Sequence, residues 1–63
     1  MFYEIDNKPY IKVGGRYTEI IVKLSPNNKI IFVPTNNNLS IRDVGRNYSI
    51  IDVATLRDKF IEN

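Results

Sequence analysis

The chain has 63 residues, carries nine basic and seven acidic side chains, and contains neither cysteine nor histidine. It therefore lacks disulfide bonds, the usual ligands of a structural zinc site, the most common general base and the best nucleophile. A chain of this length buries only about 60% of its unfolded surface, so we expect a single small domain over residues 1–63.

The first half of the chain predicts three strands in an antiparallel meander. Residues 2–5 are expected to form the first strand, followed by a loop at residues 6–9. Two glycines, Gly14 and Gly15, then join residues 10–13 to residues 16–24 in a hairpin, because glycine adopts the positive φ angles that a two-residue turn needs. This turn predicts the pairs Val13 with Arg16, Lys12 with Tyr17, Ile11 with Thr18 and Tyr10 with Glu19.

A second turn at Ser25-Pro26-Asn27-Asn28 leads into a strand at Ile30–Val33. We expect it to pair Leu24 with Ile31 and Val22 with Val33. Residues 34–38 are expected to form a loop, because proline interrupts ladder pairing and asparagine tolerates left-handed backbone.

Strand side chains alternate between the two faces of a sheet, so this register sorts the residues into two groups. One face is apolar and holds Ile11, Val13, Thr18, Ile20, Val22 and Leu24, extended by Ile31 and Val33. The other face mixes aromatic, basic and aliphatic side chains: Tyr10, Lys12, Tyr17, Glu19, Ile21, Lys23, Ile30 and Phe32.

From Leu39 onward the sequence supports two interpretations. In one, residues 41–44 and 48–53 form a third hairpin, and Thr55 caps a short terminal helix; the β-branched residues at positions 50, 51 and 53 favour this version. In the other, Ser40 and Ser49 each cap a helix, with an acidic residue three positions later in both cases. Both versions end in an amphipathic helix that covers one face of the sheet. The expected fold is thus α+β and β-rich, a meander of three to five short strands, small-barrel-like or open, with a C-terminal helix.

The mixed face suggests a contact surface, and two functions are compatible with it. The terminal helix, a partner protein or a second copy of the chain could cover it, an interpretation that Ile21 and Ile30 favour. Alternatively, its tyrosines and lysines could stack bases and bind phosphates of a nucleic acid. Arg57, in the apolar arc of the terminal helix, either snorkels to water or anchors an acidic group of a partner. The residues expected to contact a partner are Tyr10, Lys12, Arg16, Tyr17, Lys23, Phe32 and Arg57.

We expect a non-catalytic interaction protein of the inhibitor or adaptor type that self-associates as a homodimer, with nucleic-acid binding as the alternative. No catalytic, metal or cofactor site is expected, and no membrane or small-molecule partner. Thirty of the 63 residues are Asn, Ile, Lys, Tyr or Phe, whose codons are AT-rich. This composition, together with the lack of cysteine, indicates the cytoplasm of a low-GC bacterium, where the protein could be encoded by a phage or mobile element.

Overall fold

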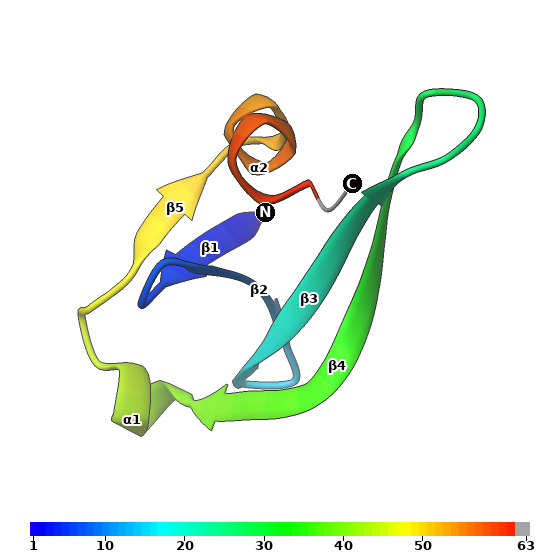
Figure 1. The fold of residues 1–63 in the computed structure, drawn as a ribbon. Helices are drawn as coiled ribbons and strands as arrows, with labels where there is room; N and C mark the ends of the chain where they lie inside the picture. The colour runs from blue at the N-terminus through cyan, green and yellow to red at the C-terminus, as the bar shows by residue number, and fades with distance from the viewer. Residues whose placement is uncertain (62–63) are drawn as a thin grey trace.

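The computed structural model describes residues 1–61, which form one antiparallel five-stranded sheet and two helices (Figure 1). The strands are β1 (Phe2–Ile5), β2 (Lys8–Val13), β3 (Arg16–Leu24), β4 (Ile30–Ser40) and β5 (Ser49–Ile51). Their order across the sheet is β4-β3-β2-β1-β5. Helix α1 (Ile41–Val44) connects β4 to β5, and helix α2 (Val53–Phe60) follows β5. The expected β-rich meander with a C-terminal helix is confirmed, and of the two expected forms the sheet has the open one.

Two tight turns set the register of the first three strands. Gly14 and Gly15 have φ angles of 56° and 77°, and the turn that they form pairs Val13 with Arg16, as the sequence predicted. The expected loop at residues 6–9 is shorter than predicted. Asp6 and Asn7, with φ angles of 52° and 65°, form a two-residue turn, and β2 already begins at Lys8.

The predicted register of the second hairpin is wrong by one residue. Leu24 pairs with Ile30 rather than with Ile31, and Val22 pairs with Phe32 rather than with Val33. The reason is a five-residue connection: the Ser25 N–H donates to the Lys29 carbonyl at 2.8 Å, and Asn28 takes a left-handed φ of 62°. A shift of one residue moves every side chain to the other face, so Ile30 and Phe32, not Ile31 and Val33, extend the apolar face.

Residues 34–38 are not a separate loop, because β4 continues through them to Ser40. The ladder is nevertheless interrupted there. Thr18 pairs with Asn38 and Ile20 pairs with Pro34, so that three residues of β4 lie opposite Glu19 alone. The Asn37 side-chain amide donates to the Glu19 carboxylate across this irregularity. Irregularities of this kind bend a strand, and Figure 1 shows β4 curving toward α1.

Neither interpretation of residues 40–53 is fully correct. Ser40 does cap a helix, α1, by accepting a hydrogen bond from the Asp43 N–H at 3.1 Å. The predicted hairpin between residues 41–44 and 48–53 does not form, because β5 pairs with β1 instead. Helix α2 is capped by Asp52, which accepts from the Thr55 N–H at 2.8 Å, and not by Ser49 or Thr55.

The sheet has a small core on each face. On one face, α2 places Leu56 against Ile20 and Val22, and all three side chains are buried. On the other face lies the second core, which consists of Ile5, Tyr10, Tyr17 and Val44, flanked by Tyr3 and Leu39. Helix α1 supplies Val44 and so covers this second face only near the β2–β3 end.

Candidate protein-binding surface

The β3–β4 hairpin extends beyond the rest of the sheet. Strand β2 pairs with β3 only as far as Glu19, so residues 20–24 and 30–34 continue as a two-stranded arm (Figure 1). This arm contributes to the elongated shape of the molecule, whose principal extents are 37 × 20 × 17 Å. We call residues 20–34 the arm.

One face of the arm is covered and the other is not. Ile20 and Val22 point toward α2 and pack on Leu56. Because side chains alternate along a strand, Ile21 and Lys23 point the opposite way, together with their cross-strand partners Val33 and Ile31. We call these four residues the uncovered face. Ile31 and Val33 are each 46% exposed, and no element of residues 1–61 packs over them.

The outer edge of β4 carries backbone groups without a strand partner among residues 1–61, since β4 is the last strand of the sheet. Their direction follows from the turn: the Ser25–Lys29 pair is hydrogen-bonded, and hydrogen-bonded and non-hydrogen-bonded pairs alternate in an antiparallel ladder. Leu24–Ile30, Val22–Phe32 and Ile20–Pro34 are then non-hydrogen-bonded pairs. The N–H and C=O groups of Ile30 and Phe32 therefore point away from β3. Pro34 occupies an equivalent position, so its lack of an N–H removes no hydrogen bond to β3.

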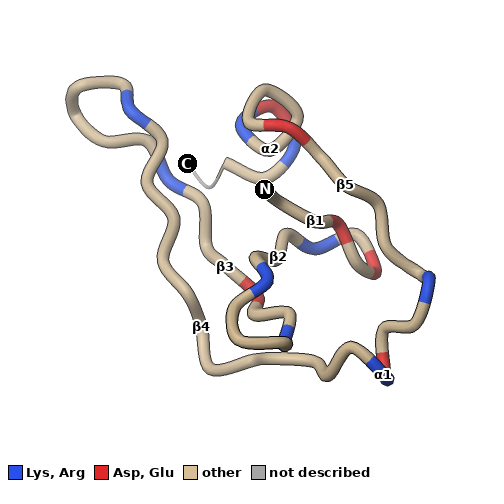
Figure 2. Tube along the Cα trace, turned by 180° about the vertical axis from the view of Figure 1, so that it is seen from behind, with Lys and Arg blue, Asp and Glu red and all other residues tan. Residues whose placement is uncertain are grey.

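The outer edge is also uncharged. Residues 30–40 contain no Asp, Glu, Lys or Arg, and the trace of β4 in Figure 2 is accordingly tan from the arm to α1. Edge strands of natural proteins are usually protected by charges, especially lysine, against pairing with other chains. Here Pro34 and the adjacent irregularity limit the edge at one end, but residues 30–33 have no such protection.

Two of the residues expected to contact a partner are in the core. Tyr10 and Tyr17 are each 3% exposed, and the Tyr17 ring packs edge-on against Tyr3 with ring centroids 5.1 Å apart. Burial raises the pKa of the Tyr10 phenol, and the negative charges of Glu19 and Asp6 raise it further, while a hydrogen bond with Asn37 lowers it. These two tyrosines hold the second core together and do not form a surface on which bases could stack.

The other expected contact residues lie at the surface in separate places. Lys12 places its ammonium 5.7 Å from the Tyr17 ring centroid, and Arg16 follows the Gly-Gly turn, so both lie at the end of β3 away from the arm. Lys23 belongs to the uncovered face. Phe32 is 41% exposed on the α2 side of the arm, edge-on to Phe2 with centroids 5.5 Å apart.

Arg57 makes a contact within the chain. Its guanidinium donates to the Asn28 side-chain oxygen at 3.2 Å, which ties α2 to the turn of the arm. Of the seven expected contact residues, the structure thus places Lys23 and Phe32 on opposite faces of the arm, with Arg57 beside its turn, and leaves the other four elsewhere.

The sequence interpretation missed Ile31 and Val33 as candidates for the contact face. The one-residue error in register assigned both to the covered face and Ile30 and Phe32 to the other. The information that would have placed them correctly was the number of residues in the turn, because the left-handed Asn28 makes a five-residue connection possible.

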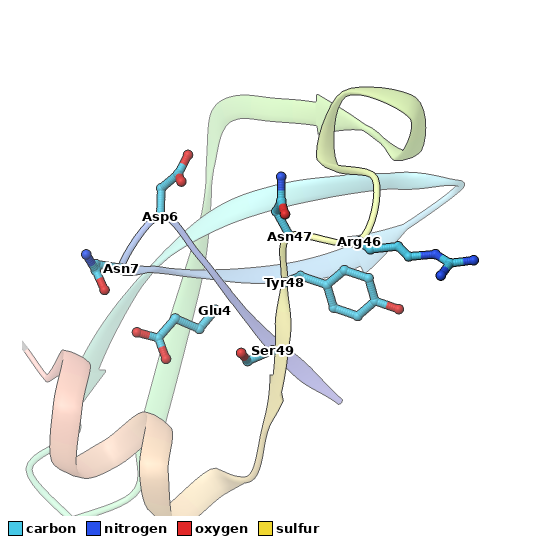
Figure 3. Close-up of a pocket in the computed structure, with 7 residues that line it drawn as sticks. All are labelled: Glu4, Asp6, Asn7, Arg46, Asn47, Tyr48 and Ser49. Carbon is cyan, nitrogen blue, oxygen red and sulfur yellow. The ribbon is translucent and has the colours of Figure 1, made fainter.

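A polar recess of about 450 Å³ lies between the β1–β2 turn and the connection from α1 to β5 (Figure 3). Glu4, Asp6 and Arg46 line it, but Figure 3 shows the Glu4 carboxylate and the Arg46 guanidinium pointing to opposite sides. Glu4 is instead paired with Lys59 of α2. The charged groups of this recess therefore do not converge on a common point where a ligand or a reaction could be held.

A second recess is apolar and has a volume of about 530 Å³. It lies at the other end of the sheet, beside β5, and is lined by Met1, Phe2, Ile50, Ile51, Asp52 and Val53. Among residues 1–61, no group of three or more acidic side chains lies close enough together to hold a metal ion. Neither helix of the described chain has the length or apolar character needed to cross a membrane.

Comparison with known proteins finds no family model, no curated protein and no solved structure that matches this chain. The uncovered face and the outer edge of β4 are therefore interpreted from their own chemistry.

Proposed function

We propose that this protein is a non-catalytic interaction protein that binds a partner protein through the uncovered face of the arm and thereby occupies a surface of that partner. The observation that supports the proposal most directly is the pair Ile31 and Val33, both 46% exposed on regular, well-paired strands. A mostly aliphatic surface with one lysine at its corner is the kind of surface that buries well against another protein.

The free energy expected from burying these two side chains makes a real but modest contribution to binding. Complete burial of a Val or Ile side chain is worth roughly 1.5–3 kcal/mol, so burying the exposed half of either residue is worth about 1 kcal/mol. Both cores of the chain are small, and the uncovered face is not needed to complete either of them. Burial against a partner would turn the exposed surface of these aliphatic side chains into binding free energy.

Nucleic-acid binding is the weaker alternative. Stacking on tyrosine was its main argument, and Tyr10 and Tyr17 are buried. The basic residues are dispersed along the chain trace and do not gather in one place (Figure 2). The composition of the chain and its lack of cysteine support action in a bacterial cytoplasm, as an inhibitor or adaptor encoded by the host or by a phage.

The test is affinity capture from a cell lysate, run with and without nuclease treatment, with three forms of the tagged chain as bait. These are the wild type, Ile31→Ser on the uncovered face, and Val13→Ser as the matched control. Val13 is 58% exposed at the end of β2 and lies away from the arm, so its change leaves the uncovered face intact. We expect the wild type and Val13→Ser to retain one protein stoichiometrically, and Ile31→Ser to retain about fivefold less, because about 1 kcal/mol is lost.

Equal retention by Ile31→Ser and Val13→Ser would refute the assignment of the surface. Retained material that disappears with nuclease would instead support the nucleic-acid alternative. A bait that retains nothing in any of its three forms would contradict the proposed function itself.

A further inference from the structure

We propose that a second copy of this chain pairs with the outer edge of β4 in antiparallel orientation, with Phe32 of both copies on the twofold axis, so that two five-stranded sheets become one. The inference concerns the edge of the arm and does not require the partner protein proposed for its face. It rests on the backbone geometry, the length of the available edge and the charges around it.

The backbone groups are self-complementary. The N–H and C=O of Phe32 both point away from β3, so two Phe32 residues placed opposite each other exchange two hydrogen bonds. In the same register Ile30 lies opposite Pro34 of the second copy, and the Ile30 N–H donates to the Pro34 carbonyl. The twofold axis repeats this bond, which gives four hydrogen bonds in total. The missing N–H of Pro34 costs nothing, because it is the carbonyl of that residue that takes part.

The limits of the edge select this register. The turn at residues 25–29 ends the edge on one side, and the irregularity opposite Glu19 ends it on the other. Five residues, Ile30 to Pro34, remain, and their centre is Phe32. A symmetric pairing centred on Ile31 would make use of fewer of these residues and would place Val33 opposite the charged Lys29.

The side chains on the uncovered face also match. Ile31 of each copy lies directly opposite Val33 of the other, and the aliphatic pair is repeated by the axis. Lys23 and Ile21 lie one strand further out on each side. The two Lys23 residues occupy opposite corners. They are three strand spacings, or roughly 14 Å, apart across the sheet and are offset along the strands as well, so their separation exceeds the distance of about 8 Å over which salt screens charges.

These properties favour a second copy over an unrelated strand. Pairing two identical edges normally brings like charges together, but residues 30–34 carry none. Figures 1 and 2, which view the molecule from opposite sides, both show β4 as the outermost strand along the arm. The contact buries less surface than the roughly 800 Å² per partner of a standard interface. We therefore expect an equilibrium between monomer and dimer and not a permanent dimer.

The test is sedimentation equilibrium of the untagged full chain from about 1 μM to about 1 mM, the range expected for a small interface. The wild type should shift from 7.3 kDa toward twice that mass as its concentration rises. Two double variants test the register. In I31E/V33E the paired positions are Glu opposite Glu, whereas in I31E/V33K they are Glu opposite Lys. Both variants carry the same glutamate at position 31, beside Lys23 of the same copy, so this neighbour contributes equally to each.

We expect I31E/V33E to weaken the dimer at least about tenfold, and I31E/V33K to stay within about threefold of the wild type and to weaken with added salt. Far-UV circular dichroism of both variants establishes that they are folded. A wild type that is monomeric throughout, an I31E/V33E variant that dimerises like the wild type, or a monomeric I31E/V33K variant beside a dimeric wild type would each overturn the inference.

The two proposals fail separately. A monomeric wild type that still captures a protein lost by Ile31→Ser would refute the pairing of copies and leave the partner-binding function intact. A dimer with the expected charge dependence that captures no other protein would do the reverse.

Discussion

Leu56 is the buried residue of α2, and its truncation gives the sharpest test of how this helix packs on the sheet. Leu56 is 0% exposed and packs against Ile20 and Val22. Replacing a fully buried leucine by alanine loses the transfer free energy of the removed carbons and leaves a cavity, which together cost about 3 kcal/mol. A domain of this size has only about 3–5 kcal/mol of stability, so Leu56→Ala should be close to unfolding at room temperature.

The assay is urea unfolding followed by circular dichroism, with Val53→Ala as the control. Val53 lies on the same helix but is 54% exposed, so its change should stay within about 0.5 kcal/mol. With a urea dependence of about 1 kcal/mol per molar, Leu56→Ala should move the midpoint down by about 3 M. A thermal melt should show a decrease of about 20 °C. A loss below about 1 kcal/mol would refute the reasoning, because it would mean that α2 does not pack on Ile20 and Val22.

Two further predictions concern the β1–β2 turn and the second core. Asn7 has a φ of 65°, which a β-branched residue adopts only at a cost of about 1–2 kcal/mol. Asn7→Val should therefore lower the free energy of unfolding by that amount, whereas Asn7→Gly should not. An Asn7→Val variant as stable as the wild type would contradict the turn geometry. The pKa of the Tyr10 phenol is raised from its ordinary value of 10.0 by burial first and then by Glu19 and Asp6. Because the pKa of the phenol is higher in the folded chain than in the unfolded chain, its contribution to stability is fully present at a pH below the unfolded-state pKa. That contribution is lost as the pH rises through the folded-state pKa, so urea midpoints should decline above about pH 10 in the wild type. The decline should be smaller in Tyr10→Phe, and parallel declines in the two proteins would show that Tyr10 is not the group responsible.

The first hairpin could be predicted from the sequence because its turn leaves no choice. Gly14 and Gly15 form a two-residue connection, and once the loop length is known every pair on both strands follows. The second turn contains Pro26, two asparagines and Lys29, which allow loops of several lengths. The prediction chose the wrong one, and the alternation of side chains then carried the error along all of β4.

The second half of the chain was harder because its partners are distant in sequence. Residues 49–51 were correctly suspected of being a strand from their β-branched side chains, but the strand that they pair with is β1, at the opposite end of the chain. Local patterns carry no information about such a pairing. The same errors affect the candidate surface. The register of β3 is predicted correctly, so Lys23 is assigned to the correct face, whereas the wrong register of β4 assigns Ile31 and Val33 to the apolar face that α2 covers.

The position of β1 between β2 and β5 has a consequence for how the protein is made. Strand β1 has one edge satisfied early, by the adjacent β2, and the other only after Ser49–Ile51 have been synthesised. Leu56, which completes one of the two cores, emerges later still. A sheet that pairs strands distant in sequence before its core closes folds more slowly than one built from local contacts. Until Ser49–Ile51 have been synthesised and paired, the inner strand β1 is itself an open edge, and a chain truncated before Ser49 would expose it permanently.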